Sequence, residues 1–353
     1  MPQLITATLT KEQFKEQFGF DEPSGLFDNP QLKDKFRLVI NRFGRCYWLL
    51  SIDNLQGPRF SGNNVYYQGN NARLIRTIYP NARRIIDVGG NAGNNTIAYS
   101  EWAQYVESFE PTPTTLTMLE ANLAIAQRSQ LQGIYWRGTD SEGDLYRDTT
   151  AEAGWYYWKG VAQSMNLVAE TTIHRVAATN RNTGTIQIQD HPEHGGHNFT
   201  VYDTKQIKKQ DYVVEVPCRT IDSYGWTDVD AIKIDVEGSE LFVIEGAEQT
   251  IKTCRPAVQV EIVPKQCKQY GYEPQALYDF FKDLDYVCVS AVRKPANADQ
   301  RGLFFGKNIG LEHKQIAKYM DRLFVPREVH EATDYGAMEQ AATEFDKIFD
   351  FGH

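Results

Sequence analysis

The stretch RIIDVGGNAGNNT, residues 84–96, decides the fold. It begins with an apolar pair at residues 85–86, which is typical of a short buried strand. Asp87 follows, and the next positions contain three glycines, Gly89, Gly90 and Gly93. Glycines let the backbone turn sharply and let a ligand approach it closely, while the start of a helix offers free N–H groups. The stretch therefore predicts a strand, a glycine-rich turn and a helix that bind a nucleotide-type ligand.

The residue types in this turn discriminate between nucleotide ligands. Asn91 stands where a dinucleotide-binding fingerprint would have its second glycine, and no Gly-Lys-Ser/Thr sequence follows as in a P-loop. An acid before the first glycine suits a ligand with a positively charged amino group and no phosphate, such as S-adenosylmethionine. The alternative is an ordinary strand–turn–helix corner of an α/β protein.

The next expected strand, residues 105–110, ends in an acid about twenty residues after the turn. At this spacing an α/β fold places a carboxylate against ribose hydroxyls. Glu110 is therefore the candidate ribose ligand. Pro111 leads from it into an expected helix at residues 115–123.

Four blocks of the sequence resemble the FkbM-type S-adenosylmethionine-dependent methyltransferases. They are DVGGNAGNNT at 87–96; FEPTP at 109–113 with Leu119 and Asn122; VPCRTIDS at 216–223 with IKIDVEGSE at 232–240 and Gly246-Ala247; and RPAVQVEI at 255–262. The resemblance covers residues 81–310. It implies S-adenosyl-L-methionine as the cofactor and O-methylation of a sugar, a glycan or another small acceptor. The cofactor site implied by these motifs comprises Asp87, Gly89, Gly90, Asn91, Gly93, Asn95, Thr96, Glu110 and Pro111.

Composition narrows the class of protein and its partners. The chain has 353 residues, and its hydrophobic content of 41% is enough for a substantial core. Its formal net charge of −9 argues against a nucleic-acid partner, whose phosphates usually meet a basic surface.

Cysteine usage and hydropathy predict a cytoplasmic protein. The chain contains five cysteines and no C-x-x-C motif, which favours free thiols in a reducing compartment. The first residues lack the basic start and apolar core of a signal peptide. No run of about eighteen apolar residues exists, so we expect no membrane span.

The pattern along the chain predicts three regions. Residues 1–80 are expected to form an N-terminal cap, and residues 81–310 a methyltransferase domain. From Arg84 onward strands alternate with helices, including a helix at 240–252, which implies a doubly wound, Rossmann-like class I methyltransferase sheet. Residues 286–290 and 302–306 are expected as its closing antiparallel strands. Residues 311–353 are expected to be a helical tail that packs on the domain or on a partner subunit of a homo-oligomer.

Two segments allow both a functional and an ordinary interpretation. The aromatic cluster at residues 155–158 could cover the acceptor, or it could fill the core or an interface. His191, His194 and His197 lie close together and could suggest a metal site. Proline and glycines make this segment a loop rather than a rigid helical pair, so we expect no metal and methyl transfer that survives chelation.

The strand expected at residues 229–236 carries the candidate catalytic residues. In doubly wound sheets ligands bind beyond the carboxyl ends of the strands, so Asp235, Glu237 and Glu261 are expected there. Lys233 shares a side of the strand with Asp235. Asp235 is the preferred general base for a hydroxyl acceptor, with Glu237, Glu261 and a loop histidine as rivals. Alternatively, Asp235 and Glu237 hydrogen-bond the following turn or orient Lys233.

Two other functions remain open at this point. A nicotinamide-dependent oxidoreductase would use a similar sheet, but the turn lacks the second fingerprint glycine and an evident pyrophosphate cradle. A non-catalytic subunit that keeps the fold would bind the cofactor without turnover.

Overall fold

The structure is a computed structural model, and it describes residues 5–7, 10–18, 21, 26–28, 36–40, 46–50, 69–132, 137–139, 145–146, 167–190, 199–200, 212–289, 308–311 and 321–336. The histidine loop at 191–197, the aromatic cluster at 155–158 and the expected strand at 302–306 lie outside these residues.

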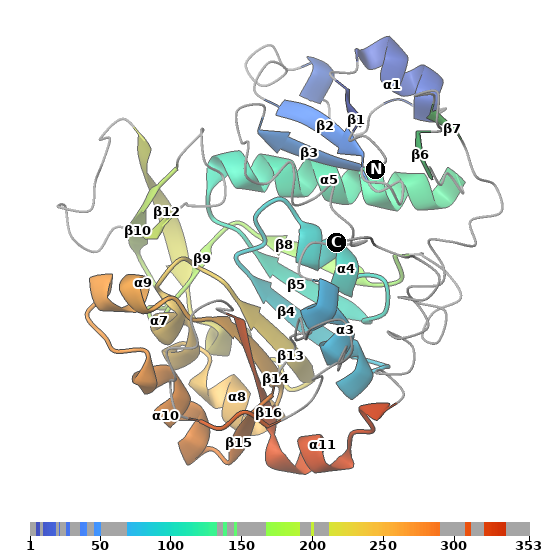
Figure 1. Ribbon diagram of the computed structural model, residues 1–353. Coiled ribbons are helices and arrows are strands. Elements are labelled where there is room, and N and C mark those ends of the chain that lie inside the picture. Colours follow the sequence, from blue (N-terminus) through green and yellow to red (C-terminus); the bar gives the residue numbers. More distant parts are fainter. Residues whose placement is uncertain are drawn as a thin grey trace, which may run out of the picture.

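A seven-stranded sheet dominates the described part of the chain, with the strand order β15-β16-β14-β13-β4-β5-β8 (Figure 1). Its strands are β4 (Arg84–Val88), β5 (Tyr105–Phe109), β8 (Glu170–His174), β13 (Val229–Ile234), β14 (Ala257–Glu261), β15 (Tyr286–Val289) and β16 (Asp321–Pro326). All are parallel except β16, which runs antiparallel to both of its neighbours. The strand order reverses between β4 and β13, and ligands bind at such a switch point in open α/β sheets.

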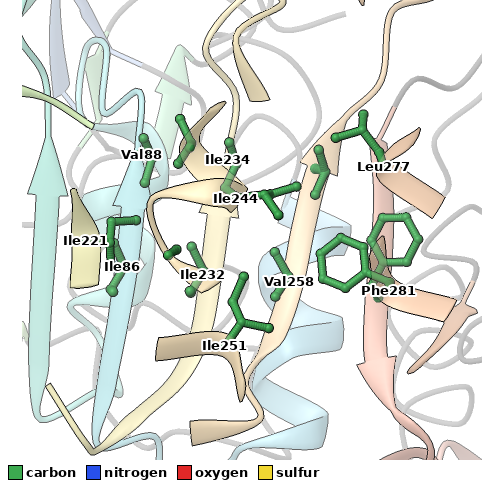
Figure 2. Close-up of a cluster of buried hydrophobic side chains, with 14 of the residues drawn as sticks. Ile86, Val88, Ile221, Ile232, Ile234, Ile244, Ile251, Val258, Leu277 and Phe281 are labelled. Atoms are coloured by element: carbon green, nitrogen blue, oxygen red, sulfur yellow. The ribbon is translucent and has the colours of Figure 1, made fainter. Parts of the chain in front are cut away.

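Alternate side chains of the strands face opposite layers of helices. One face packs its apolar residues against α7 (Glu240–Glu245), α8 (Glu248–Cys254), α10 (Gln275–Asp283) and η4 (Ile221–Tyr224). Figure 2 shows Ile232, Ile234 and Val258 of the sheet beside Ile244 and Ile251 of these helices. Full burial of such a side chain contributes about 1.5–3 kcal/mol, so this layer is the main core of the domain.

The opposite face carries polar side chains at the ends of its central strands. On this side lies α4 (Asn94–Tyr99), which packs against α3 (Gly69–Ile78) and α5 (Pro113–Gln132). Thr96 of α4 hydrogen-bonds the side chains of Asp87 and Ser108, which fixes the helix over β4 and β5. Helices therefore cover both faces, as expected for a doubly wound fold.

Three smaller sheets accompany the main one. Between β8 and β13 the chain forms a four-stranded sheet of β9 (Ala177–Ala178), β10 (Thr185–Gln189), β11 (Phe199–Thr200) and β12 (Val213–Arg219). The N-terminal region forms α1 (Lys11–Phe18), η1 (Leu26–Asp28) and the sheet β1 (Ile5–Ala7), β2 (Phe36–Ile40) and β3 (Cys46–Leu50). In Figure 1 this sheet lies beside α5, which β3 contacts. A short pair, β6 (Arg137–Thr139) and β7 (Leu145–Tyr146), completes the set.

The expectation of a helical tail from residue 311 is wrong for its middle part. Residues Asp321–Pro326 form β16, which pairs with both β14 and β15 inside the main sheet. Its apolar centre, residues 323–325, is almost fully buried. The run is too short for its periodicity to reveal a strand between polar flanks. A short helix, α11 (Arg327–Ala332), follows it.

The helix expected at residues 240–252 is divided into α7 and α8. Between them lies Gly246, where a Cβ atom would collide with the carbonyl group of Thr179. The side chain of Asp222 accepts hydrogen bonds from the backbone N–H groups of Gln249 and Thr250, and so caps the start of α8. The residues that impose the break, Thr179 and Asp222, come from distant segments of the chain.

A further helix, α9 (Pro264–Gln269), precedes α10. No helix among the described residues is long and apolar enough to cross a membrane.

Candidate functional site

The glycine-rich turn joins β4 to α4 in a tight loop. Gly89 and Gly93 have φ angles of 81° and 87°, which favour glycine, and Asn91 also has a positive φ of 48°. A Cβ atom on Gly89 would lie 1.9 Å from the Asp235 carbonyl oxygen, far closer than van der Waals contact. The loop after β4 and the loop after β13 are therefore packed directly against each other.

Asp87 and Thr96 hold this loop from beneath. Asp87 is fully buried, and its Oδ2 atom accepts a hydrogen bond of 2.6 Å from Thr96 Oγ1. Its Oδ1 atom lies 3.4 Å from the Nζ atom of Lys233. Burial raises the pKa of Asp87, and Lys233 opposes that rise. Both residues were predicted to hold the cofactor, and the structure places them where they shape the loop.

Glu110 links the loop to the start of α5. Its Oε2 atom accepts a hydrogen bond of 2.8 Å from Asn91 N, and its Oε1 atom accepts bonds from Thr112 N and Thr115 Oγ1. Burial raises the pKa of the carboxyl group, and these hydrogen bonds oppose that rise. A carboxylate oxygen offers two lone pairs, so Oε2 retains one acceptor position for a ribose hydroxyl.

Asn122 belongs to one of the four family blocks but was not among the predicted site residues, and it also holds the loop. Its Nδ2 atom donates a hydrogen bond of 2.7 Å to the carbonyl oxygen of Ala92 from the fully buried face of α5. An amide among the apolar residues of a buried helix face is the signal that could have identified it. The remaining predicted loop residues, Asn95 and Pro111, are half-buried beside it.

Lys233 connects the loop to the next strand end. Its side chain is 3% exposed, and Nζ donates a 3.0 Å hydrogen bond to the carbonyl oxygen of Gly89. The Asp235 carboxylate lies 3.5 Å from the same nitrogen. Burial alone would lower the pKa of Lys233, but the carboxylates of Asp235 and Asp87 outweigh it and raise the pKa. Lys233 is therefore a fixed cation that orients Asp235, rather than a proton carrier.

Strand register brings further polar residues to this face. Lys233 pairs with Asp87 on one side and with Gln259 on the other, and Glu261 pairs with Asp321. Side chains two residues apart share a face of the sheet. The two candidate residues Asp235 and Glu261 therefore lie on the Lys233 face, and β16 adds Asp321 beside them.

Three predicted catalytic carboxyl groups converge. One carboxylate oxygen from each of Asp235, Glu237 and Glu261 lies within 4.8 Å of the others. Burial and the neighbouring charges of Asp235 and Glu237 raise the pKa of Glu261 to about 10. Burial and Asp235 also raise the pKa of Asp321, to about 6. With its pKa raised in this way, Glu261 is a poorer proton acceptor than its neighbours, which leaves Asp235 and Glu237 as the preferred candidate bases.

Glu237 has a left-handed backbone, with a φ angle of 56°. Non-glycine residues in this conformation carry strain, which is often found at functional sites. Gln266 Nε2 donates a hydrogen bond to the Glu237 carboxylate. The residue is therefore held by a neighbour outside the turn, consistent with an orienting role.

Glu240 organises the backbone of the same turn. Its Oε1 atom accepts hydrogen bonds from Val236 N at 3.1 Å and Gly238 N at 3.0 Å, and Tyr272 donates to Oε2. The side chain is almost fully buried, and burial raises its pKa to about 7 in spite of the backbone hydrogen bonds.

We expect Glu240→Gln to reduce the pH dependence of stability. Because the folded pKa of Glu240 lies above the unfolded value, its protonated form favours folding, and that contribution is lost as pH rises from about 4.5 through about 7. The shift corresponds to about 3 kcal/mol. Gln keeps an oxygen acceptor and does not ionise, so the unfolding free energy of the variant relative to wild type should rise between pH 5 and pH 8. Urea denaturation at both pH values measures this difference, with the exposed Glu248→Gln as the control. Parallel pH profiles for wild type and Glu240→Gln would contradict it.

The described residues therefore form one continuous site at the switch point of the sheet. The glycine loop places backbone groups close to the buried carboxyl group of Asp87 and to Glu110. The adjacent strand ends supply Asp235, Glu237 and Glu261, held by Lys233. Such an arrangement can bind a cationic nucleotide-type ligand and accept a proton beside it.

Comparison with known families places this site in a recognised domain. The FkbM methyltransferase domain family matches residues 87–288, which is more than half of the chain. The match includes the glycine loop, Glu110, Asp235 and Glu261. No curated protein matches the sequence.

Solved structures resemble the chain at low identity. Methyltransferase FkbM from Methylobacillus flagellatus KT is 15% identical with a TM-score of 0.36, and the match covers 69% of this chain and 44% of that one. The O-methyltransferase TomG from Streptomyces achromogenes, in complex with SAM, is 13% identical with a TM-score of 0.32, over 73% of this chain and 79% of that one. An rRNA methylase from Streptococcus thermophilus is 9% identical with a TM-score of 0.32, over 74% of this chain and 94% of that one.

This chain spans less than half of the length of the Methylobacillus protein. The strand order and the single antiparallel strand β16 confirm the predicted doubly wound, Rossmann-like class I methyltransferase fold. With a family match over residues 87–288, the chain belongs to the FkbM methyltransferase domain family.

Proposed function

We propose that the protein is an S-adenosylmethionine-dependent O-methyltransferase that acts on a hydroxyl group of a sugar, a glycan or another small acceptor. The observation that carries this proposal is the contact between the two loops. The Gly89 backbone packs on Asp235, and Lys233 binds both the Gly89 carbonyl and the Asp235 carboxylate. A ligand at the glycine loop would therefore lie next to a carboxylate that can act as a base.

The residues of the site fit S-adenosylmethionine better than a dinucleotide. The described turn presents acids and backbone groups, and the cation in contact with it, Lys233, is buried and paired with Asp87 and Asp235. A pyrophosphate would gain no free cation from this set. A sulfonium and an amino group are both positively charged, so nearby carboxylates favour them electrostatically. When bound, this cofactor would supply a methyl group that is already activated for transfer.

The chain itself would align the acceptor and remove its proton. A hydroxyl oxygen that forms a new bond to carbon must lose its proton, and Asp235 is placed to accept it. Lys233 keeps that carboxylate oriented, while Glu237 and Glu261 lie close enough to Asp235 to hydrogen-bond the hydroxyl groups of an acceptor. A non-catalytic subunit would have no need for this arrangement, which favours an enzyme.

Glu110→Ala is expected to weaken binding of S-adenosylmethionine by about 1–3 kcal/mol, the scale for loss of a buried hydrogen-bonding partner. The variant removes the acceptor left for ribose and also releases the Asn91 N–H group. Titration calorimetry with S-adenosylmethionine, its demethylated product and NAD measures the effect, with Glu120→Ala, a partly exposed residue of α5, as a control. Affinity for NAD without affinity for the sulfonium compound would overturn the cofactor assignment.

The acceptor class has its own experiment. The purified protein is incubated with methyl-labelled cofactor and a panel of monosaccharides, glycans and small hydroxylated compounds. We expect label to appear in a hydroxyl-bearing acceptor as an ether methyl group. Tight cofactor binding with no transfer to any acceptor in the panel or in fractionated cell extract would instead favour the non-catalytic subunit.

A further inference from the structure

We propose that Asp235, Glu237 and Glu261 form a binding site for a divalent cation of the magnesium, manganese or calcium type. These residues come from two different strand ends, β13 and β14, and meet at the switch point of the sheet. Carboxylate oxygens are the ligands that such hard cations prefer.

The geometry suits a single ion. The three ligand oxygens all lie within 4.8 Å of one another. Two oxygens bound to one Ca²⁺ at 2.3–2.6 Å can be at most about 5 Å apart, and small side-chain movements bring them to the shorter distances of Mg²⁺. No backbone rearrangement is needed to bring the three groups onto one centre.

A buried amide oxygen gives an independent indication of a missing ligand. Gln259 is 1% exposed, and its Nε2 atom donates to Asp321 Oδ1 at 3.3 Å, beside Glu261 in the strand register. The amide end therefore reaches toward the carboxylate group, yet its Oε1 atom has no hydrogen-bond partner within the described residues. Buried polar atoms are almost always paired with protein or ordered water, and a water held by a cation would donate to this oxygen.

The hydroxyl group of Tyr99 is a second buried polar group of this kind. Tyr99 belongs to α4, its side chain is fully buried, and no described residue hydrogen-bonds its hydroxyl group. The charges of Asp87, Asp321 and Asp235 act on it, which places it among the same carboxylates. A phenol oxygen can accept a hydrogen bond as well as donate one. A hydrated ion would therefore satisfy polar atoms from both the sheet and the helix.

The charges of the neighbouring residues also favour a bound cation. Four carboxyl groups, those of Asp235, Glu237, Glu261 and Asp321, lie together, and Lys233 is shared between Asp235 and Asp87. Arg322 donates a hydrogen bond from Nε to the Tyr278 hydroxyl, and its charge also acts on Asp321. A divalent cation would offset the negative charge that these carboxyl groups bring together.

The sequence predicts methyl transfer that needs no metal, and it suggests a metal only at the histidine loop. The proposed cation site is a different one and departs from that expectation. The role of the cation in catalysis rests on the proposed function: it would hold the acceptor oxygen and lower the pKa of its hydroxyl group, which eases proton transfer to Asp235. Binding of the cation itself does not depend on that function and can be measured alone.

The test is a titration of Mn²⁺ into the full-length, chelator-treated protein, with neither cofactor nor acceptor present. Electron paramagnetic resonance counts the free Mn²⁺, and competition with Mg²⁺ and Ca²⁺ compares the ions. We expect one site per chain, and a loss of affinity of at least about tenfold in Glu237→Gln and in Glu261→Gln, because each replaces a carboxyl ligand with an amide. Glu248→Gln, which changes an exposed carboxylate on α8, should bind Mn²⁺ as the wild type does.

Each outcome decides the proposal. Absence of Mn²⁺ binding at millimolar concentration, or equal binding by wild type and both variants, would overturn it. Glu237 is more accessible than the core, so Glu237→Gln keeps the test valid if Glu261→Gln does not fold. If Mn²⁺ binds at this site while calorimetry detects no S-adenosylmethionine, the proposed function fails and the cation site stands. If the cofactor binds and methyl transfer is unaffected by chelation, while Mn²⁺ does not bind, the cation site alone fails.

Discussion

Asp235→Asn is expected to lower the rate of methyl transfer by about 10²–10⁴-fold, the usual contribution of a general base. The substitution keeps the size and shape of the side chain and removes its basicity. Lys233 retains its contacts with Asp87 and with the Gly89 carbonyl, so the glycine loop should keep its conformation. Affinity for the cofactor should therefore change little.

Single-turnover kinetics measures this effect, because it separates the chemical step from product release. The reaction is followed with and without added Mg²⁺, so that a weakened cation site is not mistaken for a lost base. Glu237→Gln is the matched comparison and should affect alignment and stability more than the chemical step, because Glu237 is bonded to Gln266. If Asp235→Asn transfers methyl at the wild-type rate while Glu261→Gln or His194→Ala does not, the base has been assigned to the wrong group.

Local sequence was sufficient to predict the first loop. The apolar pair before Asp87, the glycines and the acid at the end of the next strand each depend on neighbouring residues, and the structure forms the expected strand, turn and helix. The positive φ angles of Gly89 and Gly93 are the physical reason that glycine occupies these positions. The parallel direction of these strands follows from the same pattern of alternating strands and helices.

Contacts between distant segments could not be predicted in this way. Asp321 lies beside Glu261 because β16 inserts between β14 and β15, sixty residues further along the chain, and no periodicity in so short a strand signals that pairing. Gln259 and Tyr99 become relevant through buried polar atoms that no described residue hydrogen-bonds, a property that exists in the folded chain alone. The sequence could thus name Asp235 and Glu261, but it could not show that burial and neighbouring charges raise the pKa of Glu261.

Gly89→Ala should have the largest effect on folding among the substitutions in the loop. Gly89 has a φ angle of 81°, and an added methyl group would collide with the carbonyl oxygen of Asp235. The obstacle is backbone rather than a flexible side chain, so the loops after β4 and β13 would have to move apart. Lys233 contacts both loops, so their separation would also disturb its hydrogen bond to the Gly89 carbonyl and its ion pair with Asp235.

Gly271→Ala separates the two causes. Gly271 has nearly the same φ angle, 83°, but a Cβ atom there would meet nothing within 4 Å. Backbone strain alone should therefore lower its unfolding free energy by about 1 kcal/mol. For Gly89→Ala we expect a loss of about 3–5 kcal/mol, the range of severe steric mutations, together with loss of cofactor binding. Urea denaturation measures both variants, and calorimetry measures the binding. Equal destabilisation of the two would mean that the contact between the glycine loop and Asp235 contributes little, and the coupling of the cofactor loop to the proposed base would then be wrong.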